Sequence, residues 1–305
     1  MNISPQAGKS VSPGPRVSLV TGGTGGIGLA VATTLARGGD RVIFVGRDRA
    51  RGASVLETLR ILNPAAEHVF VPGDLSLLAE TARVADAVMW HAHRLDAIVF
   101  CAGVLSLVPE WTAEDLERTF ALNYLSRYLM ARRLLPLLER SQSGRLVLVA
   151  NAGRYADTLD FDDLQHRRGK PGLSVSGRTQ FANDLLAVEL AERLEGSPIE
   201  ATCVFPGLVR TNVFRNARGV PRLVQIVTAA LQPFVAAPPE RAAGTPVFLA
   251  QSSSAIGTGG RFFGPGVKEI KVPDQARDPE RRRLLWDASE RLASRYIDVD
   301  IRVPA

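Results

Sequence analysis

A glycine-rich run, Thr21-Gly22-Gly23-Thr24-Gly25-Gly26-Ile27-Gly28, has the clearest chemical meaning in the sequence. It follows an apolar stretch typical of a strand, residues 17–20, and leads directly into a helical pattern. Glycines at such a strand-to-helix turn let the backbone approach a pyrophosphate, and the helix N-terminus points its N–H groups at the charge. We therefore predict a dinucleotide site here and regard a merely tight turn as the weaker interpretation.

The residue after the second expected strand indicates which dinucleotide is bound. That strand ends in Gly46-Arg47-Asp48, where a protein that binds NAD usually has an acidic residue for the ribose hydroxyls. An arginine at this point favours the 2′-phosphate of NADP instead. Arg47 therefore predicts NADP(H), with the alternative that it is one surface side chain among the chain's 33 arginines.

The elements that position these residues follow a regular alternation. Short β-branched runs alternate with longer helical patterns from Arg16 onward, which predicts a single α/β domain with a Rossmann-type, doubly wound parallel sheet. Seven strands are expected at residues 17–21, 41–46, 68–72, 97–101, 145–150, 200–205 and 261–263. Helices are expected at residues 27–37, 113–139, 178–194 and 279–294.

Two segments stand outside this alternation. Residues 1–14 are rich in Ser, Pro and Gly without the apolar stretch of a signal peptide, so we expect a disordered leader before a domain of residues 15–305. Residues 209–239 interrupt the α/β pattern, and their apolar part, residues 221–235, could form a lid over a bulky non-polar substrate. Plain packing of that stretch against the domain is an equally good interpretation.

Composition excludes several classes of function. The formal net charge is +6, but the arginines are scattered through the expected helices, which argues against a nucleic-acid surface. Cys101 and Cys203 lie in apolar runs and the four histidines lack ligand spacing, so we predict no metal site. The longest apolar segment falls well short of the roughly 20 residues of a membrane span. We expect a cytoplasmic protein without a membrane span, and leave open whether it forms a homo-oligomer.

Several motifs together resemble the short-chain dehydrogenase/reductase family, over roughly residues 15 to 295. Thr21, Gly22, Gly26 and Gly28 match its TGxxxGxG motif, Asp74-Leu75 its adenine-contacting pair, Cys101-Ala102-Gly103 its NNAG turn without the asparagines, Asn123 its helix asparagine, and Pro206-Gly207-Leu208-Val209-Arg210-Thr211 its PGxVxT segment. The resemblance implies cofactor contacts from Thr21, Gly22, Thr24, Gly26, Ile27, Gly28, Arg47, Asp74, Leu75, Ala102, Gly103, Gln180, Pro206, Gly207, Val209 and Thr211.

Two further stretches look most like the retinol-dehydrogenase-like branch of this family. They are residues 159–165, Leu-Asp-Phe-Asp-Asp-Leu-Gln, and the block Phe181-Ala182-Asn183. This resemblance implies a lipophilic carbonyl or alcohol as the substrate.

The family's catalytic positions are altered. In the family a Ser polarises the substrate oxygen, a Tyr exchanges its proton, and a Lys four residues later lowers the Tyr pKa and holds the nicotinamide ribose. The matching positions here read Asn151, Ser176 and Gln180. No YxxxK motif occurs in the chain, because Tyr128, Arg132, Leu159 and Asp300 stand four residues after its tyrosines 124, 128, 155 and 296.

The consequence for proton transfer follows from the groups present. A serine hydroxyl is a far weaker acid than a phenol, whose pKa is about 10, and neutral Gln180 has no charge to lower it. Losing a positioned acid typically costs about 10²- to 10⁴-fold in rate. Gln180 could still bond the ribose hydroxyls. Tyr155, four residues after Asn151, could serve as a substitute acid, or could simply be a packed loop residue.

Three functions remain open. The first is an enzyme that binds NADP(H) and promotes a redox-neutral cyclisation, dehydration or isomerisation in a biosynthetic pathway, with Asn123, Asn151 and Ser176 orienting a lipophilic substrate. The second is a reductase or dehydrogenase with a replaced acid, either Tyr155 or a water. The third is a non-catalytic scaffold or sensor stabilised by the nucleotide. An enzymatic role is favoured because the nucleotide motifs are kept together with an apolar lid candidate.

Overall fold

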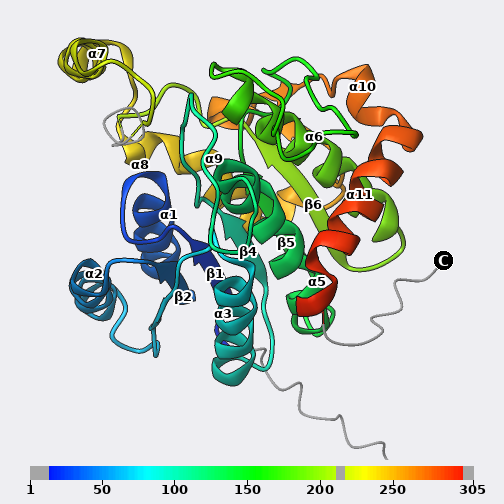
Figure 1. The fold of residues 1–305 in the computed structure, drawn as a ribbon. Coiled ribbons are helices and arrows are strands. Elements are labelled where there is room, and N and C mark those ends of the chain that lie inside the picture. Colours follow the sequence, from blue (N-terminus) through cyan, green and yellow to red (C-terminus); the bar gives the residue numbers. More distant parts are fainter. Residues whose placement is uncertain (1–13, 211–216, 298–305) are drawn as a thin grey trace, which may run out of the picture.

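The computed structural model describes residues 14–210 and 217–297, and for residues 228–231 and 233–235 it describes the backbone only. Residues 1–13 of the expected leader, residues 298–305 at the end of the expected domain, and Thr211 lie outside this description. Figure 1 shows one central sheet with helices on both of its faces. This arrangement confirms the expected doubly wound α/β fold.

Among the described residues, eight strands form one sheet in the order β3-β2-β1-β4-β5-β6-β7-β8. Their bounds are β1 Val17–Thr21, β2 Arg41–Gly46, β3 Val69–Pro72, β4 Ala97–Phe100, β5 Gly144–Val149, β6 Ile199–Val204, β7 Phe262–Phe263 and β8 Glu269–Ile270. The first seven run parallel and β8 pairs antiparallel with β7. The expected seven strands are thus present, and β8 is an addition only two residues long.

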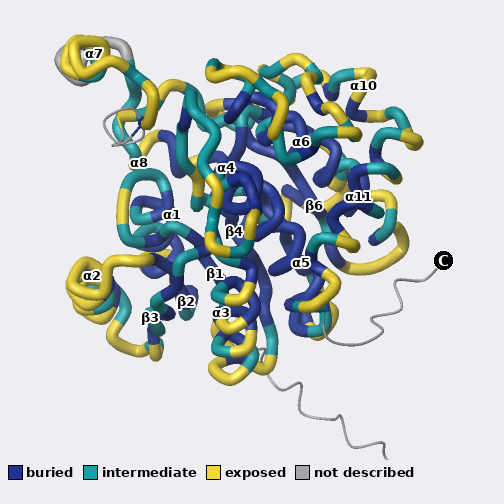
Figure 2. Tube along the Cα trace, in the orientation of Figure 1, coloured by how far each residue is buried: buried dark blue, intermediate teal, exposed yellow. Residues whose placement is uncertain are grey.

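Two layers of helices cover the sheet (Figure 1). One layer contains α1 Gly26–Arg37, α2 Arg49–Leu62 and α9 Gly244–Gln251, and the other contains α3 Leu78–His91, α5 Ser126–Leu138, α6 Ser174–Arg193 and α11 Pro279–Ala293. Shorter helices are α4 Arg118–Phe120, α8 Pro239–Ala242 and α10 Asp274–Arg277. The central strands are almost wholly buried, as the dark tube in Figure 2 shows, whereas β3 and β8 at the two edges of the sheet are only partly buried.

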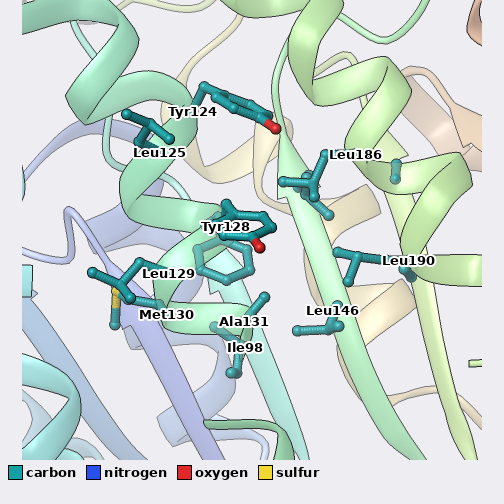
Figure 3. Packing of buried hydrophobic residues seen from close by; sticks show 14 of the residues in the cluster. Ile98, Tyr124, Leu125, Tyr128, Leu129, Met130, Ala131, Leu146, Leu186 and Leu190 are labelled. Atoms are coloured by element: carbon teal, nitrogen blue, oxygen red, sulfur yellow. The ribbon is translucent and has the colours of Figure 1, made fainter. Parts of the chain in front are cut away.

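The core beside the site lies between α5, α6 and the sheet (Figure 3). Leu129 of α5 and Leu186 of α6 pack with Ile98 of β4 and Leu146 of β5, and all four side chains are buried. Apolar residues recur along these helices at the spacing that places them on one face. The core therefore fixes α5 and α6 against β4 and β5.

The helix expected at residues 113–139 is wrong in its first part. The helical path begins at Arg118, because the Glu117 carboxylate accepts hydrogen bonds from the backbone nitrogens of Thr119 and Phe120 and caps the N-terminus. The path then passes through a π-helical turn, Ala121–Leu125, before α5 begins. Such turns are frequent at functional sites, and this one contains Asn123.

Helix α11 covers the outer side of α5. The rings of Trp286 and Tyr128 meet edge to face with centroids 5.0 Å apart, and the Tyr124 hydroxyl lies 2.7 Å from Ser289 Oγ. All but one residue of α5 are buried as a result. Helix α5 is therefore buried by other elements of the same chain, without a second copy.

Candidate functional site: a nucleotide-type cleft

A cleft of about 640 Å³ opens at the carboxyl ends of β1 and β4. Its wall is made of the glycine turn, the first residues after β4 and a polar rim. The lining residues are Gly22, Thr24, Gly25, Gly26, Ile27, Gly28, Arg47, Arg51, Cys101, Ala102, Gly103, Val104, Leu105, Ser106, Val108, Glu110, Glu117, Arg118, Thr119 and Arg218. An adjoining hollow of about 150 Å³ shares part of this wall and adds Val45, Gly46, Gly73, Asp74, Leu75 and Leu122.

The glycine turn is packed too tightly for side chains. Gly22 has φ +68°, and a Cβ there would lie 3.0 Å from the backbone of Ala102. A Cβ on Gly28 would lie 2.3 Å from the Gly22 carbonyl oxygen. Thr21 Oγ1 accepts hydrogen bonds from the backbone nitrogens of Cys101 and Ala102, both at 3.1 Å. The turn thus forms a glycine cradle at the start of α1, the arrangement that accommodates a pyrophosphate.

Two arginines follow β2 along the cleft. Arg47 Nη1 lies 3.7 Å from Asp74 Oδ2, and both side chains are substantially exposed, so this ion pair is weak. Arg51, in the first turn of α2, also lines the cleft, and its Nε lies 3.3 Å from Asp48 Oδ2. Two cationic groups therefore line the cleft after β2. Sequence reasoning missed Arg51, because no motif includes it.

Two polar side chains hold the backbone of residues 104–108, which we call the clamped segment. The Asn123 amide oxygen accepts a hydrogen bond from Val104 N at 2.9 Å, and its amide nitrogen donates to Val104 O at 3.0 Å. The Ser176 hydroxyl accepts from Ser106 N and donates to Ser106 O, both at 2.8 Å. Each side chain therefore pairs with both backbone groups of one residue.

The clamped segment lies between the cleft and two of the expected catalytic residues, Asn123 and Ser176. Four of its five residues line the cleft, whereas Asn123, Asn151, Ser176, Gln180 and Tyr155 do not. Ser176 is only 4% exposed, and Gln180 is half-buried one turn further along α6. The structure thus brings Asn123 and Ser176 to the same segment, with their hydrogen-bonding groups turned toward the protein backbone.

Asn151 and Tyr155 lie in the loop that follows β5. The Asn151 carbonyl oxygen accepts from Arg154 N at 2.8 Å in a tight turn. The ring of Tyr155 packs on Gly177, where a Cβ would lie 3.0 Å from Tyr155 Cδ1. Tyr155 therefore lies against α6 at the residue next to Ser176.

The far side of the clamped segment is tied to the long excursion after β6. Leu107 N donates to Arg218 O at 2.8 Å, and the Arg218 guanidinium pairs with the Glu110 carboxylate. Glu110 also pairs with Arg118 at 3.2 Å. Sequence reasoning missed these polar residues, because the Arg218–Glu110 pair joins positions 108 residues apart and Glu110 and Arg118 belong to no motif.

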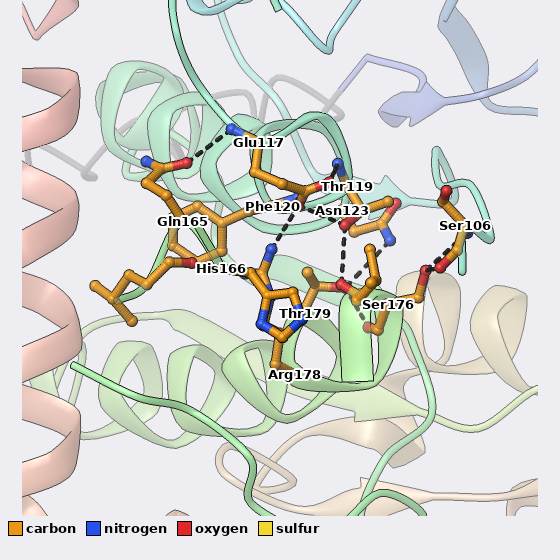
Figure 4. A network of polar contacts seen from close by, with 12 residues as sticks. Ser106, Glu117, Thr119, Phe120, Asn123, Gln165, His166, Ser176, Arg178 and Thr179 are labelled. Carbon is orange, nitrogen blue, oxygen red and sulfur yellow. Dashed lines mark hydrogen bonds and ion pairs between the residues drawn. The ribbon is translucent and has the colours of Figure 1, made fainter. Parts of the chain in front are cut away.

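Beneath the cleft, a fully buried ion pair joins α6 to the start of α4 (Figure 4). Arg178 Nη2 lies 2.5 Å from Glu117 Oε2, and Arg178 Nη1 donates to the Leu164 carbonyl oxygen at 2.7 Å. The Arg178 guanidinium lies over the Phe120 ring, 5.4 Å from its centroid. This network fixes Thr119, whose hydroxyl donates to Glu117, at the cleft wall.

Two more charged groups are buried near the site. Arg127 donates to the carbonyl oxygens of Ala102 and Val149, each at 3.0 Å, and burial lowers its pKa to about 10. The Asp184 carboxylate accepts from Gly153 N at 2.9 Å, and burial raises its pKa to about 7. Arg127 thus remains charged at neutral pH, whereas Asp184 titrates there.

The segment after β6 lies beside the Tyr155 loop. The Arg154 guanidinium lies 4.9 Å from the centroid of the Phe205 ring, next to Pro206. Gly207 adopts φ +84°, and Val209 forms a parallel bridge with Ala237. Pro206, Gly207 and Val209 do not line the cleft.

A larger, open hollow of about 1040 Å³ lies elsewhere, at the amino end of β6. Charged residues of both signs line it, among them Glu192, Glu200, Arg261 and Lys271. It contains none of the motif residues. Ligands of doubly wound sheets bind at the carboxyl ends of the strands, so the smaller cleft is the candidate site.

Several known proteins are similar to this chain in sequence or in structure. A family model described as short chain dehydrogenase matches residues 16–158. Retinol dehydrogenase 14 of Homo sapiens is 34% identical, with 89% of this chain and 84% of that protein covered. Polyprenol dehydrogenase of Mus musculus is 33% identical, with 91% and 83% covered. The solved Pseudomonas aeruginosa RhlG/NADP active-site complex has a TM-score of 0.62 and 25% identity, with 82% and 94% covered.

Proposed function

Because the chain belongs to the short-chain dehydrogenase/reductase family, in its retinol-dehydrogenase-like branch, we propose that it binds NADP(H) in the cleft. We further propose that it promotes a redox-neutral step, such as a cyclisation, dehydration or isomerisation, on a bulky lipophilic substrate. The observation on which this rests is the Ser176 hydroxyl, whose donor and acceptor functions are both used by Ser106.

The glycine cradle supports the nucleotide part of the proposal. A Cβ at Gly22 or Gly28 would collide with backbone, so the close backbone approach that a pyrophosphate needs is built into the turn. Arg47 and Arg51 would hold the 2′-phosphate. Further contacts are assigned to residues that line the cleft or the adjoining hollow, Thr24, Gly26, Ile27, Asp74, Leu75, Ala102 and Gly103, with Thr21 holding the turn. Gln180, Pro206, Gly207 and Val209 do not line the cleft, and we assign them, with Thr211, to the nicotinamide end of the nucleotide. The bound nucleotide would supply a hydride carrier, or a rigid wall for the substrate.

The polar residues support the redox-neutral part. We assign Asn151, Ser176 and Gln180 to the family's Ser, Tyr and Lys positions, so this site has no phenol and ammonium pair there. Without that pair, the protonation that accompanies hydride transfer lacks its usual donor. Orientation of the substrate by Asn151 needs no such donor, and Asn123, whose amide is bonded to Val104 and Thr179, would act by holding the clamped segment.

A specific contact favours one second candidate, a carbonyl reductase with a substitute acid. Tyr155 packs on Gly177, next to the Ser176 position, and is the phenol that the structure brings to this part of α6. In this candidate Tyr155 would donate the proton to the substrate oxygen. This candidate transfers a hydride from NADPH to the substrate, whereas the redox-neutral candidate transfers none.

The substrate class is proposed from the relatives and from the excursion after β6. The relatives are named for retinol and polyprenol, both lipophilic alcohols. We propose that the excursion at residues 209–239, which includes helix α7 Arg222–Val235, meets such a substrate in the cytoplasm where Arg218 reaches the cleft wall. Arg218 supports this, because it joins the excursion to the cleft wall.

The test is an assay of purified protein with NADPH and a panel of lipophilic ketones and aldehydes. We expect NADPH to bind without oxidation at 340 nm, while mass spectrometry detects an isomerised, cyclised or dehydrated product from the panel. Oxidation that disappears in Tyr155→Phe would instead establish the second candidate. Binding without any product would leave a nucleotide-stabilised scaffold and contradict both enzymatic candidates.

A further inference from the structure

Helix α7 exposes aliphatic side chains to an unusual degree. Leu223, Val224, Ile226 and Val227 are 72%, 50%, 58% and 49% exposed, so four exposed aliphatics fall within five consecutive residues. Figure 1 shows the helix projecting from the body of the molecule, and Figure 2 shows its described part coloured as exposed. Large exposed apolar patches mark interaction sites in soluble proteins.

The attachment of α7 turns a polar residue inward. Gln225 is the half-buried residue among positions 221–227, and its amide nitrogen donates to the carbonyl oxygens of Ala217 at 2.9 Å and Val220 at 3.2 Å. A helix that packs on a core buries its apolar side and exposes its polar side. The first two turns of α7 do the opposite, so their aliphatic side faces outward.

The described chain around the start of α7 carries positive charge only. Within residues 217–239 the cations are Arg218 and Arg222, with Arg210 just before them in the described chain, and no aspartate or glutamate lies in these stretches. Arg218 is paired with Glu110, so the positive charge available to a partner is that of Arg210 and Arg222. Arg210 and Arg222 are exposed, and Arg222 is the first residue of α7. An aliphatic helix face beside cationic groups complements an anionic lipid surface, where apolar side chains enter the acyl boundary and arginines meet phosphates.

We propose that α7 docks in the plane of an anionic lipid bilayer through Leu223, Val224, Ile226 and Val227, with Arg222 at the headgroups. No helix within the described residues is long and apolar enough to cross a bilayer, so the contact is peripheral. Arg218 lines the cleft and pairs with Glu110, which places the docking helix on the same excursion as the cleft wall. Delivery of a lipophilic substrate by this route rests on the proposed function, whereas docking itself does not.

The experiment is co-sedimentation of the full chain with sucrose-loaded vesicles. One set is phosphatidylcholine alone, and the other is an equal mixture of phosphatidylcholine and phosphatidylglycerol. We expect binding to the mixed vesicles that weakens with added salt. The double variant Leu223→Ser with Ile226→Ser should lower the partition coefficient between vesicles and water at least about tenfold. Arg222→Glu should remove the preference for the mixed vesicles.

A matched control is Ile61→Ser with Ile256→Ser, which removes two aliphatics that are equally exposed but lie outside α7. This control should bind vesicles like the wild type. Equal loss in both double variants, or no vesicle binding by the wild type, would overturn the proposal. It would also be overturned by a wild-type dimer that the α7 variant converts to a monomer, because a second copy would then cover this face. A parallel NADPH titration of each variant separates these outcomes from a failure of the proposed nucleotide site.

Discussion

The Ser176 hydroxyl lies 2.8 Å from both the backbone nitrogen and the backbone oxygen of Ser106. One side chain on α6 therefore satisfies both polar groups of a residue in the clamped segment, and Asn123 does the same for Val104. A serine is short enough to make this contact from within the helix packing. The residue type at position 176 thus determines how closely the segment can approach α6.

Removing this contact should destabilise the fold without abolishing nucleotide binding. In Ser176→Ala the buried N–H and C=O of Ser106 lose their partner, which costs about 1–3 kcal/mol of unfolding free energy. Urea denaturation measures the loss, with Ser254→Ala, at an exposed position, as the control. Equal stability of the two variants would show that the clamp contributes nothing.

Restoring the family pair is the complementary change. Ser176→Tyr with Gln180→Lys supplies a phenol and an ammonium, and we expect NADPH oxidation with lipophilic ketones to appear. The new ring must displace the clamped segment, so the variant should also be less stable than the wild type. A folded, NADPH-binding double variant without activity would show that the pocket differs at more than these two positions.

The buried ion pair should be the most sensitive polar contact of the fold. Arg178→Met leaves the Glu117 carboxylate buried without its cation, which lowers the unfolding free energy by about 3–5 kcal/mol. Arg283→Met removes an exposed arginine paired with Asp287 and should change stability by less than about 1 kcal/mol. Chemical denaturation of both variants tests this, and similar losses would refute the assigned role.

Asp184 should make stability depend on pH. Burial raises its folded pKa to about 7 from 3.8, so the folded state holds a proton that the unfolded state releases. Its contribution is therefore most favourable below pH 3.8 and is lost as the pH rises toward 7. Relative to Asp184→Asn, the wild type should lose up to about 1.4 kcal/mol per pH unit in this range. Parallel curves for the two proteins between pH 4 and 7 would contradict this prediction.

The glycine cradle should tolerate no side chain. Gly28→Ala places a Cβ 2.3 Å from the Gly22 carbonyl oxygen, so the turn must open and NADPH affinity should fall at least about tenfold. Gly244→Ala is the control, because a Cβ at that position meets no atom within 4 Å. Calorimetry with both variants measures the effect, and unchanged affinity in Gly28→Ala would remove the assigned role of the turn.

Local signals predicted the sheet well. Strands β1 and β2 have the expected bounds, because each is rich in apolar residues and a glycine marks its end, Gly22 directly after β1 and Gly46 as the last residue of β2. Strand β8 was not expected, since two residues leave no periodic pattern. The helix start at Arg118 was also missed, because it depends on the pairing of Glu117 with Arg178, 61 residues away.

The candidate site was predictable only where a motif lies in one stretch of chain. Gly22, Gly26, Gly28 and Arg47 were expected and do line the cleft. The pairing of Ser176 with Ser106 spans 70 residues and has no sequence signal. The clamped segment, which lies between the cleft and the side chains of Asn123 and Ser176, could therefore be found only from the structure.

The central claim is that the cleft binds NADP(H) through the glycine cradle and Arg47. Isothermal titration with NADPH and with NADH tests it most directly, for the wild type and for Arg47→Asp. We expect the wild type to prefer NADPH by about 10- to 100-fold, the worth of one charge-assisted contact, and Arg47→Asp to lose that preference. Absence of NADPH binding by the folded wild type, or an unchanged preference in Arg47→Asp, would contradict the claim.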